Sequence, residues 1–383
     1  MSVSVNGKVV LAPDKFKGSV TAPEVADALA EGLLSVRPEL AVVRLPVADG
    51  GDGTLAAAVW AGYELVPVVA DGPTGAPVQT AFASREGTAV VELADVTGLR
   101  RLSGPTAPLT ASTYGVGQVI AAALDHGATR IVLGIGGSSS TDGGAGMLAA
   151  LGVRLADADG APIGRGGAAL MGLASIDPTG LDQRLLGGVT VLVASDVRHP
   201  LLGPSGAAAV FGPQKGASPD DVALLDQALA RWAVLTESVT GRDVAAAPGA
   251  GAAGGTGFGA LAYLGARLVP GVDLVLDLIG FDAALAGAAL AITGEGSLDD
   301  QSLGGKAPVG VAKAAARHGV PVVAVAGQVR LTEAEIGDAG FAAVYALTDL
   351  EPDPAVSMAN ASGLLIRIGQ KIANSSLLAV EPA

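Results

Sequence analysis

Residues 130–147, R-I-V-L-G-I-G-G-S-S-S-T-D-G-G-A-G-M, decide the fold class of this chain. The run 131–133 is β-branched and apolar, which is typical of a strand that is buried on both faces. A loop of glycines and small hydroxyl residues follows, with Asp142 at its centre, and apolar residues return at helical spacing from Ala145. A strand that enters a glycine-rich loop and continues as a helix predicts an α/β unit.

The loop in this stretch has the composition of an anion-binding site. Backbone N–H groups at a helix N-terminus attract anions, and phosphate is the anion that they usually bind. Glycines let a ligand approach the backbone closely, and hydroxyl groups add hydrogen-bond donors. An ordinary helix cap is the alternative, but four glycines around one aspartate favour a functional loop. We predict that phosphate is held by Gly136, Gly137, Ser138, Ser139, Asp142, Gly143 and Gly144.

The composition sets bounds on the class of protein. A chain of 383 residues is long enough for two domains. Half of the residues are hydrophobic and 3% are aromatic, so we expect closely packed Ala, Val and Leu, as in layered α/β proteins. The net charge of -14 argues against nucleic-acid binding, which needs a basic surface. The absence of cysteine excludes disulfides, thiolate catalysis and cysteine-bound metals.

The sequence also bears on location. The N-terminal residues M-S-V-S-V-N-G-K have no basic region followed by an apolar core, which predicts no signal peptide. Apolar runs are interrupted by Gly, Pro or charge before they reach membrane-spanning length. We therefore expect a soluble, cytoplasmic protein with no membrane partner.

Two strands near the N-terminus end in polar turns. Lys8–Ala12 precedes P-D-K-F-K-G-S, and Ala41–Val47 precedes A-D-G-G-D-G-T. A helix follows each turn, and the first helix begins with a capping box of Thr21 and Glu24. In such βαβ units ligands collect at the carboxyl ends of the strands. The topology therefore predicts cleft residues at Asp14, Lys15, Lys17, Asp49 and Asp52.

The rest of the chain predicts an antiparallel section and then a return to strand–helix alternation. Short alternating strands cover 63–96, and a buried strand over 189–194 ends beside Asp196. The later expectations are a helix over 260–268, strands over 289–293, 322–326 and 341–347, and a C-terminal helix over 356–378. We expect a Rossmann-like parallel-sheet domain from 1–70 and 270–383, discontinuous in sequence. A smaller α/β domain is inserted over 71–269, and residues 113–150 are compatible with either domain.

Common signatures are absent or lack their structural context. Lys306 follows Gly305, but Asp300 and Ala307 replace residues that a Walker A motif requires. The match to G-x-G-x-x-G over 249–254 does not follow a convincing strand, and the three histidines lack metal-ligand spacing. What remains is a set of Asp, Glu, Lys and Gly residues at strand ends. Phosphoryl transfer uses such a set: donors for phosphates, carboxylates for Mg²⁺ and one carboxylate to accept a proton.

Several long motifs, in order along the chain, resemble the bacterial glycerate kinase family, the two-domain type without a P-loop. They are A-P-D-K-F-K-G-S-V-T-A-P-E-V-A, P-V-A-D-G-G-D-G-T, G-I-G-G-S-S-S-T-D-G-G-A-G-M, S-D-V-R-H-P-L-L-G-P-S-G-A, F-G-P-Q-K-G-A-S, P-G-A-G-A-A-G-G and I-T-G-E-G-S-L-D-D-Q-S-L-G-G-K-A-P-V-G-V-A. The resemblance implies ATP- and Mg²⁺-dependent phosphorylation of D-glycerate, with O2 favoured over O3. The run 138–141, Asp52 and Ser195 depart mildly from the family pattern.

The residues and the resemblance together suggest roles for the site. Asp196, Lys17 and Asp49 are the expected catalytic residues, with Asp196 as the acceptor of the hydroxyl proton. Substrate binding is expected at Asp14, Lys15, Arg198 and Asp299; ATP phosphates at the loop 136–144 and Lys306; and Mg²⁺ at Glu295 and Asp299.

Two other classes of function stay open at this point. A non-enzymatic sensor of phosphate or sugar acids would explain the glycine loops but not the surplus of carboxylates at strand ends. An NAD-dependent dehydrogenase is supported only by the match over 249–254. The sequence does not decide the oligomeric state, and a homo-oligomer is one of the options.

Overall fold

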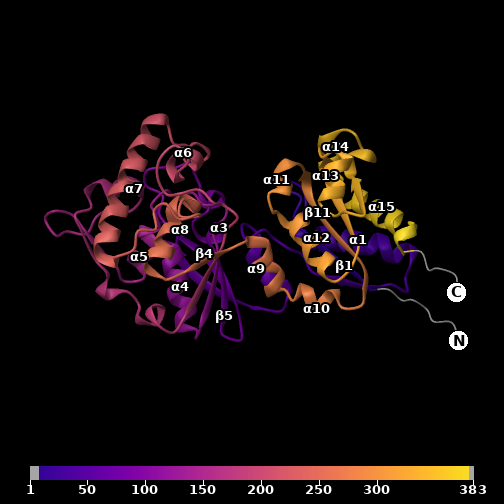
Figure 1. Cartoon of the computed structure of the whole chain (residues 1–383), viewed down its shortest axis with the longest axis horizontal. Coiled ribbons are helices and arrows are strands. Elements are labelled where there is room, and N and C mark those ends of the chain that lie inside the picture. The colour runs from indigo at the N-terminus through magenta and orange to yellow at the C-terminus, as the bar shows by residue number, and fades with distance from the viewer. Residues whose placement is uncertain (1–7, 379–383) are drawn as a thin grey trace. The chain divides into compact units, whose positions relative to one another are not determined.

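The computed structural model describes residues 8–378, and these divide into two compact units. Unit 1 contains residues 8–49, 56–61 and 272–378, and unit 2 contains 50–55 and 62–271. Unit 1 is therefore built from both ends of the chain, and indigo and yellow ribbons occur together in it in Figure 1. The N-terminal residues 1–7, for which no signal peptide is predicted, lie outside the described residues.

Unit 1 contains a parallel sheet of five strands in the order β13-β12-β11-β1-β2. Numbered along the chain, this order is 2-1-3-4-5, which is a doubly wound arrangement. Its topological switch point lies between β1 and β11, where ligands bind in open sheets of this kind. The strands are β1 (Lys8–Pro13), β2 (Ala41–Arg44), β11 (Ala288–Leu298), β12 (Val322–Val329) and β13 (Ala343–Ala346).

Helices cover both faces of this sheet because its central strands are apolar on both sides. Val9 and Leu11 of β1 join one core with helices α1 (Ala22–Val36) and α15 (Ala361–Ala373). Val10 and Ala12 join the opposite core with α9 (Gly271–Leu278), α10 (Phe281–Leu285) and α12 (Ala307–Arg317). The remaining helices are α2 (Thr54–Trp60), α11 (Asp300–Leu303), α13 (Glu333–Asp338) and α14 (Pro354–Ala359).

The predicted capping box at the start of α1 is confirmed. The Thr21 N–H donates to Glu24 Oε2 over 2.7 Å, and the Glu24 N–H donates to Thr21 Oγ1 over 3.4 Å. These bonds satisfy two of the N–H groups that a helix start leaves unpaired.

Unit 2 contains a mixed sheet of six strands in the order β10-β9-β6-β5-β4-β3. The strands β3, β4 and β5 pair antiparallel, as predicted for residues 63–96, whereas β5, β6, β9 and β10 are parallel. Their bounds are β3 (Glu64–Asp71), β4 (Pro77–Arg85), β5 (Thr88–Glu92), β6 (Arg130–Gly134), β9 (Thr190–Ala194) and β10 (Arg267–Val269). A small antiparallel pair is formed by β7 (Arg154–Ala156) and β8 (Ser175–Asp177).

The helices of unit 2 close one core around Trp232. Its ring stacks on Tyr263 at 5.7 Å between centroids and meets Phe258 edge-on at 6.3 Å. The longest of these helices begins with a capping box, in which Ser218 Oγ accepts the Asp221 N–H. The helices are α3 (Leu93–Thr97), α4 (Tyr114–Asp125), α5 (Ala145–Ala150), α6 (Ala207–Phe211), α7 (Pro219–Thr240) and α8 (Ala252–Tyr263).

The α/β class with mostly parallel sheets is confirmed, but two helix predictions are wrong. The helix expected over 260–268 ends at Tyr263, because Gly265 adopts a φ of +58° and the chain then enters β10. The single helix expected over 356–378 is two helices, α14 and α15, interrupted at Asn360. No helix among residues 8–378 is long and apolar enough to cross a membrane.

The contact between α1 and α15 generates a stability prediction. A Cβ added at Gly32 would lie 2.1 Å from the carbonyl oxygen of Ile366, so Gly32→Ala must push the two helices apart. We expect a loss of about 1–3 kcal/mol in the free energy of unfolding, measured by urea denaturation. Gly337→Ala is the matched control, since its Cβ meets nothing within 4 Å and alanine favours a helix. Equal stability of the two variants would contradict this account of the packing.

Candidate active site

The acidic residues of unit 1 gather at the switch point of its sheet. Asp14 directly follows β1, and its N–H donates to the carbonyl of Gly294 in β11 over 2.8 Å. Glu295 is the next residue of β11. Asp49 follows β2, and the chain just before it is held by the bond from the Val47 N–H to the Pro13 carbonyl, 2.9 Å. Parallel pairing thus delivers three carboxylates from three segments to one edge of the sheet.

Burial and mutual repulsion change the acidity of this cluster. Burial raises the pKa of Asp14 to about 7, and the negative charges of Asp49 and Glu295 add to the rise. The neighbouring charge and N–H of Lys15 act in the opposite direction. Burial likewise raises the pKa of Glu295, against the hydroxyl of Ser302 and the charge of Lys306. A carboxyl group that titrates near neutral pH is suited to accept and release a proton.

Two lysines lie beside these acids. Lys15 Nζ is 3.6 Å from Asp14 Oδ1, and Lys306 Nζ is 3.8 Å from Glu295 Oε2. Lys306 is also the residue that precedes the first turn of α12. Lys17 is exposed two residues after Lys15, in the same turn. The predicted role of Lys306 in holding ATP phosphates stays a prediction.

The predicted Mg²⁺ ligands can be compared with their surroundings. Among residues 8–378, no group of three or more His, Asp or Glu side chains is arranged to hold a metal ion. Mg²⁺ often needs only one or two protein carboxylates, because waters and phosphates complete its shell. Glu295 Oε1 is buried without a hydrogen-bond partner, which fits such a ligand. Asp299 accepts hydrogen bonds from Ser297 Oγ and the Gln301 N–H, both 3.0 Å, as the cap of α11.

In unit 2, residues 50–55 lie against the carboxyl ends of the parallel strands. A Cβ on Gly134 would lie 2.8 Å from the Gly50 carbonyl, and a Cβ on Gly136 would lie 2.6 Å from the Gly51 Cα. A Cβ on Gly50, whose φ is +85°, would lie 2.7 Å from the Cβ of Ala194. Only glycine allows this contact of backbone with backbone. Asp52 is thereby placed at the same edge as the end of β6.

The predicted phosphate loop has a buried part and an accessible part. Ser138 to Gly144 are buried, whereas Gly136 is half-buried and Gly137 is exposed. The buried Asp142 carboxylate accepts the Thr113 N–H at 2.8 Å and the Gly144 and Gly146 N–H groups at 3.3 Å. The N–H groups at the start of α5 therefore donate to the Asp142 side chain of the loop itself. The backbone at Gly136 and Gly137 is the part that faces solvent.

Asp196 and Arg198 extend from the end of β9 and are exposed. Asp196 Oδ1 accepts the N–H of Gly271, the first residue of α9, over 3.0 Å. The structure therefore groups the predicted site residues by unit. Asp14, Lys15, Asp49, Glu295 and Lys306 gather in unit 1. The segment 50–55, the loop at 136–137 and Asp196 lie along the strand ends of unit 2.

These geometries can be compared with known proteins. A family model described as Glycerate kinase family matches residues 9–377. The chain belongs to the glycerate kinase family. It is 46% identical over 344 residues to a glycerate kinase of Bacillus subtilis (strain 168), which covers 89% of this chain and 90% of that protein. It is 42% identical over 345 residues to the glycerate 2-kinase of Escherichia coli (strain K12), again covering 89% and 90%.

A solved structure agrees with this assignment. A crystal structure from Salmonella typhimurium LT2, described as a candidate glycerate kinase 2, superposes with a TM-score of 0.83 at 41% identity. The match covers 96% of this chain and 97% of that one. Membership of the glycerate kinase family confirms the resemblance seen in the motifs and the prediction of an enzyme, a phosphotransferase with an alcohol acceptor. A kinase of this family uses a nucleotide phosphate donor.

Family membership leaves the dehydrogenase alternative without support, and the structure explains its motif. Gly249 and Gly254 lie around the kinked start of α8 rather than after a strand. A Cβ on Gly254 would lie 2.0 Å from the Ser140 carbonyl, so this glycine serves close packing against the 136–144 loop.

Three charged residues of unit 2 were not predicted from the sequence as site residues: Lys215, Glu92 and Arg100. Lys215 is fully buried, and its ammonium donates to Ser138 Oγ at 2.8 Å and the Ser140 carbonyl at 2.5 Å. Glu92, the last residue of β5, is 2% exposed and is paired with Arg100. The signals were present: Lys215 lies in the motif F-G-P-Q-K-G-A-S, and Glu92 is an acid at a strand end.

The burial of Lys215 generates a pH-dependent stability prediction. Burial lowers the pKa of Lys215 from 10.5 to about 7, against the attraction of Asp142. Between these values the unfolded chain binds a proton that the folded chain does not, so stability rises with pH. We expect the unfolding free energy of the wild type, relative to Lys215→Met, to increase between pH 7 and 10 by at most about 1.4 kcal/mol per pH unit.

The measurement is urea unfolding of both proteins across that pH range. Lys313→Met, at an exposed lysine, is the control and should give a difference that does not change with pH. A flat difference for Lys215→Met as well would show that the buried amine keeps its ordinary pKa.

Proposed function

We propose that this protein transfers the γ-phosphoryl group of ATP to O2 of D-glycerate, with Mg²⁺, giving 2-phosphoglycerate and ADP. The observation that carries the proposal is the carboxylate cluster of half-buried Asp14 and Asp49 with buried Glu295 at the switch point of unit 1. Family membership supports glycerate as the substrate, and the name of the Escherichia coli relative, glycerate 2-kinase, supports O2.

Asp14 is our candidate for the proton acceptor. The O2 hydroxyl of glycerate attacks the γ-phosphorus, its proton passes to the Asp14 carboxylate, and the bond between the γ-phosphorus and the bridging oxygen of ADP breaks. A general base works best when its pKa lies near the operating pH, and burial brings the pKa of Asp14 to about 7. Asp196, the base expected from the sequence, is exposed and accepts a backbone N–H. It is therefore assigned a supporting role in substrate orientation.

Cationic residues would hold the anionic groups. Lys15 and Lys17, in the turn after β1, would pair with the glycerate carboxylate. Lys306, at the start of α12, would contact the transferring phosphate, since its ammonium lies beside the reactive acid cluster. The exposed backbone at Gly136 and Gly137, together with Arg198, would contact the other ATP phosphates.

Glu295 and Asp299 would hold the Mg²⁺ ion. The unpaired buried Oε1 of Glu295 supports this assignment, and hydrogen bonds from Ser297 and Gln301 outweigh burial to lower the pKa of Asp299. When bound, Mg²⁺ neutralises charge that develops on the phosphates. Asp49 orients the substrate in this scheme. The partner is thus a small molecule, and the cytoplasm is the proposed location.

The proposal is tested by coupled ADP release with D-glycerate, ATP and Mg²⁺, with L-glycerate, glycerol and glycolate as controls. Phosphorus NMR identifies the product. We expect turnover specific for D-glycerate and a 2-phosphoglycerate signal. Binding of glycerate without ADP release would instead support a sensor, and a 3-phosphoglycerate signal would overturn the choice of O2.

Removal of the proposed base generates a kinetic prediction. We expect Asp14→Asn to lower kcat about 10²–10⁴-fold, the usual contribution of a general base. In the wild type, kcat/KM should fall about tenfold per pH unit below pH 7, because Asp14 must be ionised to accept the proton. The variant should lose this acid limb. The measurement is the pH dependence of ADP release for both proteins.

Two further variants decide between the candidate bases. Asp338→Asn, at an exposed acid of unit 1, controls for general effects of removing a charge and should keep wild-type kinetics. Asp196→Asn should lose much less turnover than Asp14→Asn. The reverse order would assign the base role to Asp196.

A further inference from the structure

The segment Gly50–Leu55 has little regular structure of its own to fix it. Gly50 and Gly53 adopt φ values of +85° and +104°, and α2 begins only at Thr54. Two bonds within the segment run from the Thr54 N–H and Thr54 Oγ1 to the Gly51 carbonyl, 3.2 and 2.7 Å. Yet the segment packs against the predicted phosphate loop, where a Cβ on Gly136 would lie 2.6 Å from the Gly51 Cα. Its conformation therefore needs support from elsewhere in the chain.

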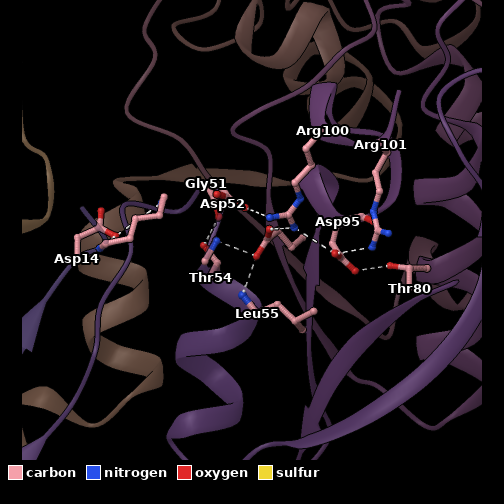
Figure 2. A network of polar contacts seen from close by, with 12 residues as sticks. Asp14, Gly51, Asp52, Thr54, Leu55, Thr80, Asp95, Arg100 and Arg101 are labelled. Atoms are coloured by element: carbon pink, nitrogen blue, oxygen red, sulfur yellow. Dashed lines mark hydrogen bonds and ion pairs between the residues drawn. The ribbon is translucent and has the colours of Figure 1, made fainter. Parts of the chain in front are cut away.

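Glu92 supplies that support from the end of β5. Its Oε2 accepts the Gly53 N–H at 3.1 Å and the Leu55 N–H at 3.0 Å. Its Oε1 accepts Arg100 Nη2 at 3.0 Å, and Arg100 Nη1 pairs in turn with the Asp52 carboxylate. One buried carboxylate and one arginine thus hold both the backbone and a side chain of the segment. Figure 2 shows Arg100 between Asp52 and Asp95, beside Thr54 and Leu55.

An ion pair at this position is a costly way to obtain packing alone. A buried carboxylate loses its hydration, and apolar residues of similar volume often give equal or greater stability. Glu92 accepts hydrogen bonds from the segment 50–55 and from Arg100, which itself holds Asp52. Asp95 Oδ1 accepts a hydrogen bond from Arg100 Nη2 at 3.1 Å, and the same carboxylate also accepts hydrogen bonds from Arg101 and Thr80. The network therefore converges on this segment.

We propose that Glu92 and Arg100 are positioning residues for the transfer reaction: they clamp Gly50–Leu55 and so fix the backbone against which Gly136 of the predicted phosphate loop packs. The inference rests on the proposed function only in giving the backbone at Gly136 and Gly137 a part in the reaction. A displacement of about 1 Å in a bound group can cost 10²-fold in rate, so a clamp on the residues beside it affects turnover.

The clamp is sensitive to pH. Burial raises the pKa of Glu92 to about 7, and the charge of Asp52 adds to the rise. The N–H groups of Leu55 and Gly53 and the charge of Arg100 oppose it. Asp95 lies on the far side of Arg100. Protonation below pH 7 removes the charge that pairs with Arg100 and weakens acceptance of the two N–H groups.

Hydrogen–deuterium exchange and kinetics together test the clamp. The variants are Glu92→Gln, which keeps the shape, Glu92→Ala and Arg100→Lys; Glu64→Gln, at an exposed acid of β3, is the control. We expect exchange across 50–55 to rise at least tenfold in Glu92→Ala. In the wild type, protection of these amides, corrected for the intrinsic exchange rate, should fall below pH 7. In Glu92→Gln it should not depend on pH.

Turnover separates positioning from simple folding support. We expect kcat to fall 10–100-fold in Glu92→Gln and Glu92→Ala, with KM for glycerate and ATP changed less than threefold and with circular dichroism unchanged. Arg100→Lys should lose less of kcat than the two Glu92 variants, because it keeps the positive charge. Glu64→Gln should match the wild type.

The opposing outcomes are distinct. Faster exchange with wild-type kcat, or unchanged exchange in Glu92→Ala, would overturn the positioning role. Failure of the wild type to release ADP from ATP and D-glycerate would overturn the proposed function instead. In that case the exchange experiment still decides whether Glu92 holds the segment.

Discussion

The crowding of three carboxylates at the switch point of unit 1 is the constraint on which the proposed chemistry depends. Parallel pairing of β1 with its neighbours brings Asp14, Asp49 and Glu295 together, and burial raises the pKa of Asp14 and of Glu295. Because the folded pKa of Asp14 lies above its unfolded value, the folded state holds a proton that the unfolded state releases between about pH 4 and 7. Stability contributed by Asp14 therefore falls as pH rises through that range. The site is maintained at a cost to stability, which is common where residues serve function.

Backbone proximity is the second theme, and it places the strand ends of unit 2. Glycines at 134, 136 and 50 allow main chain to lie directly on main chain, which brings residues 50–55 to the carboxyl edge of β6 and β9. The charged network of Glu92 and Arg100 then fixes the backbone conformation of residues 50–55, which the glycines alone do not determine. A glycine-rich segment is accessible to ligands because it lacks side chains, and it needs outside contacts for the same reason.

Local signals in the sequence predicted much of this structure. Apolar patterns and the Thr21–Glu24 capping box predicted where strands and helices lie, and the position of acids at strand ends pointed to Asp14, Asp49 and Glu295. Long-range partners were beyond such signals. The pairing of Lys306 with Glu295, the burial of Lys215 under the 136–144 loop and the grip of Glu92 on residues 53 and 55 join segments far apart in the chain. The helix expected over 260–268 failed because a positive φ at Gly265 outweighs an apolar pattern.

The most direct test of the central claim is the pKa of Asp14, measured by ¹³C NMR of labelled aspartate carboxyl groups, with Asp14→Asn to assign the resonance. A midpoint near 7, moving to lower pH in Asp49→Asn as one repelling charge is removed, is what burial and carboxylate crowding require. A midpoint near 4, the ordinary value for aspartate, would show that the cluster does not tune this group. The switch point would then lack the base that the proposed transfer needs.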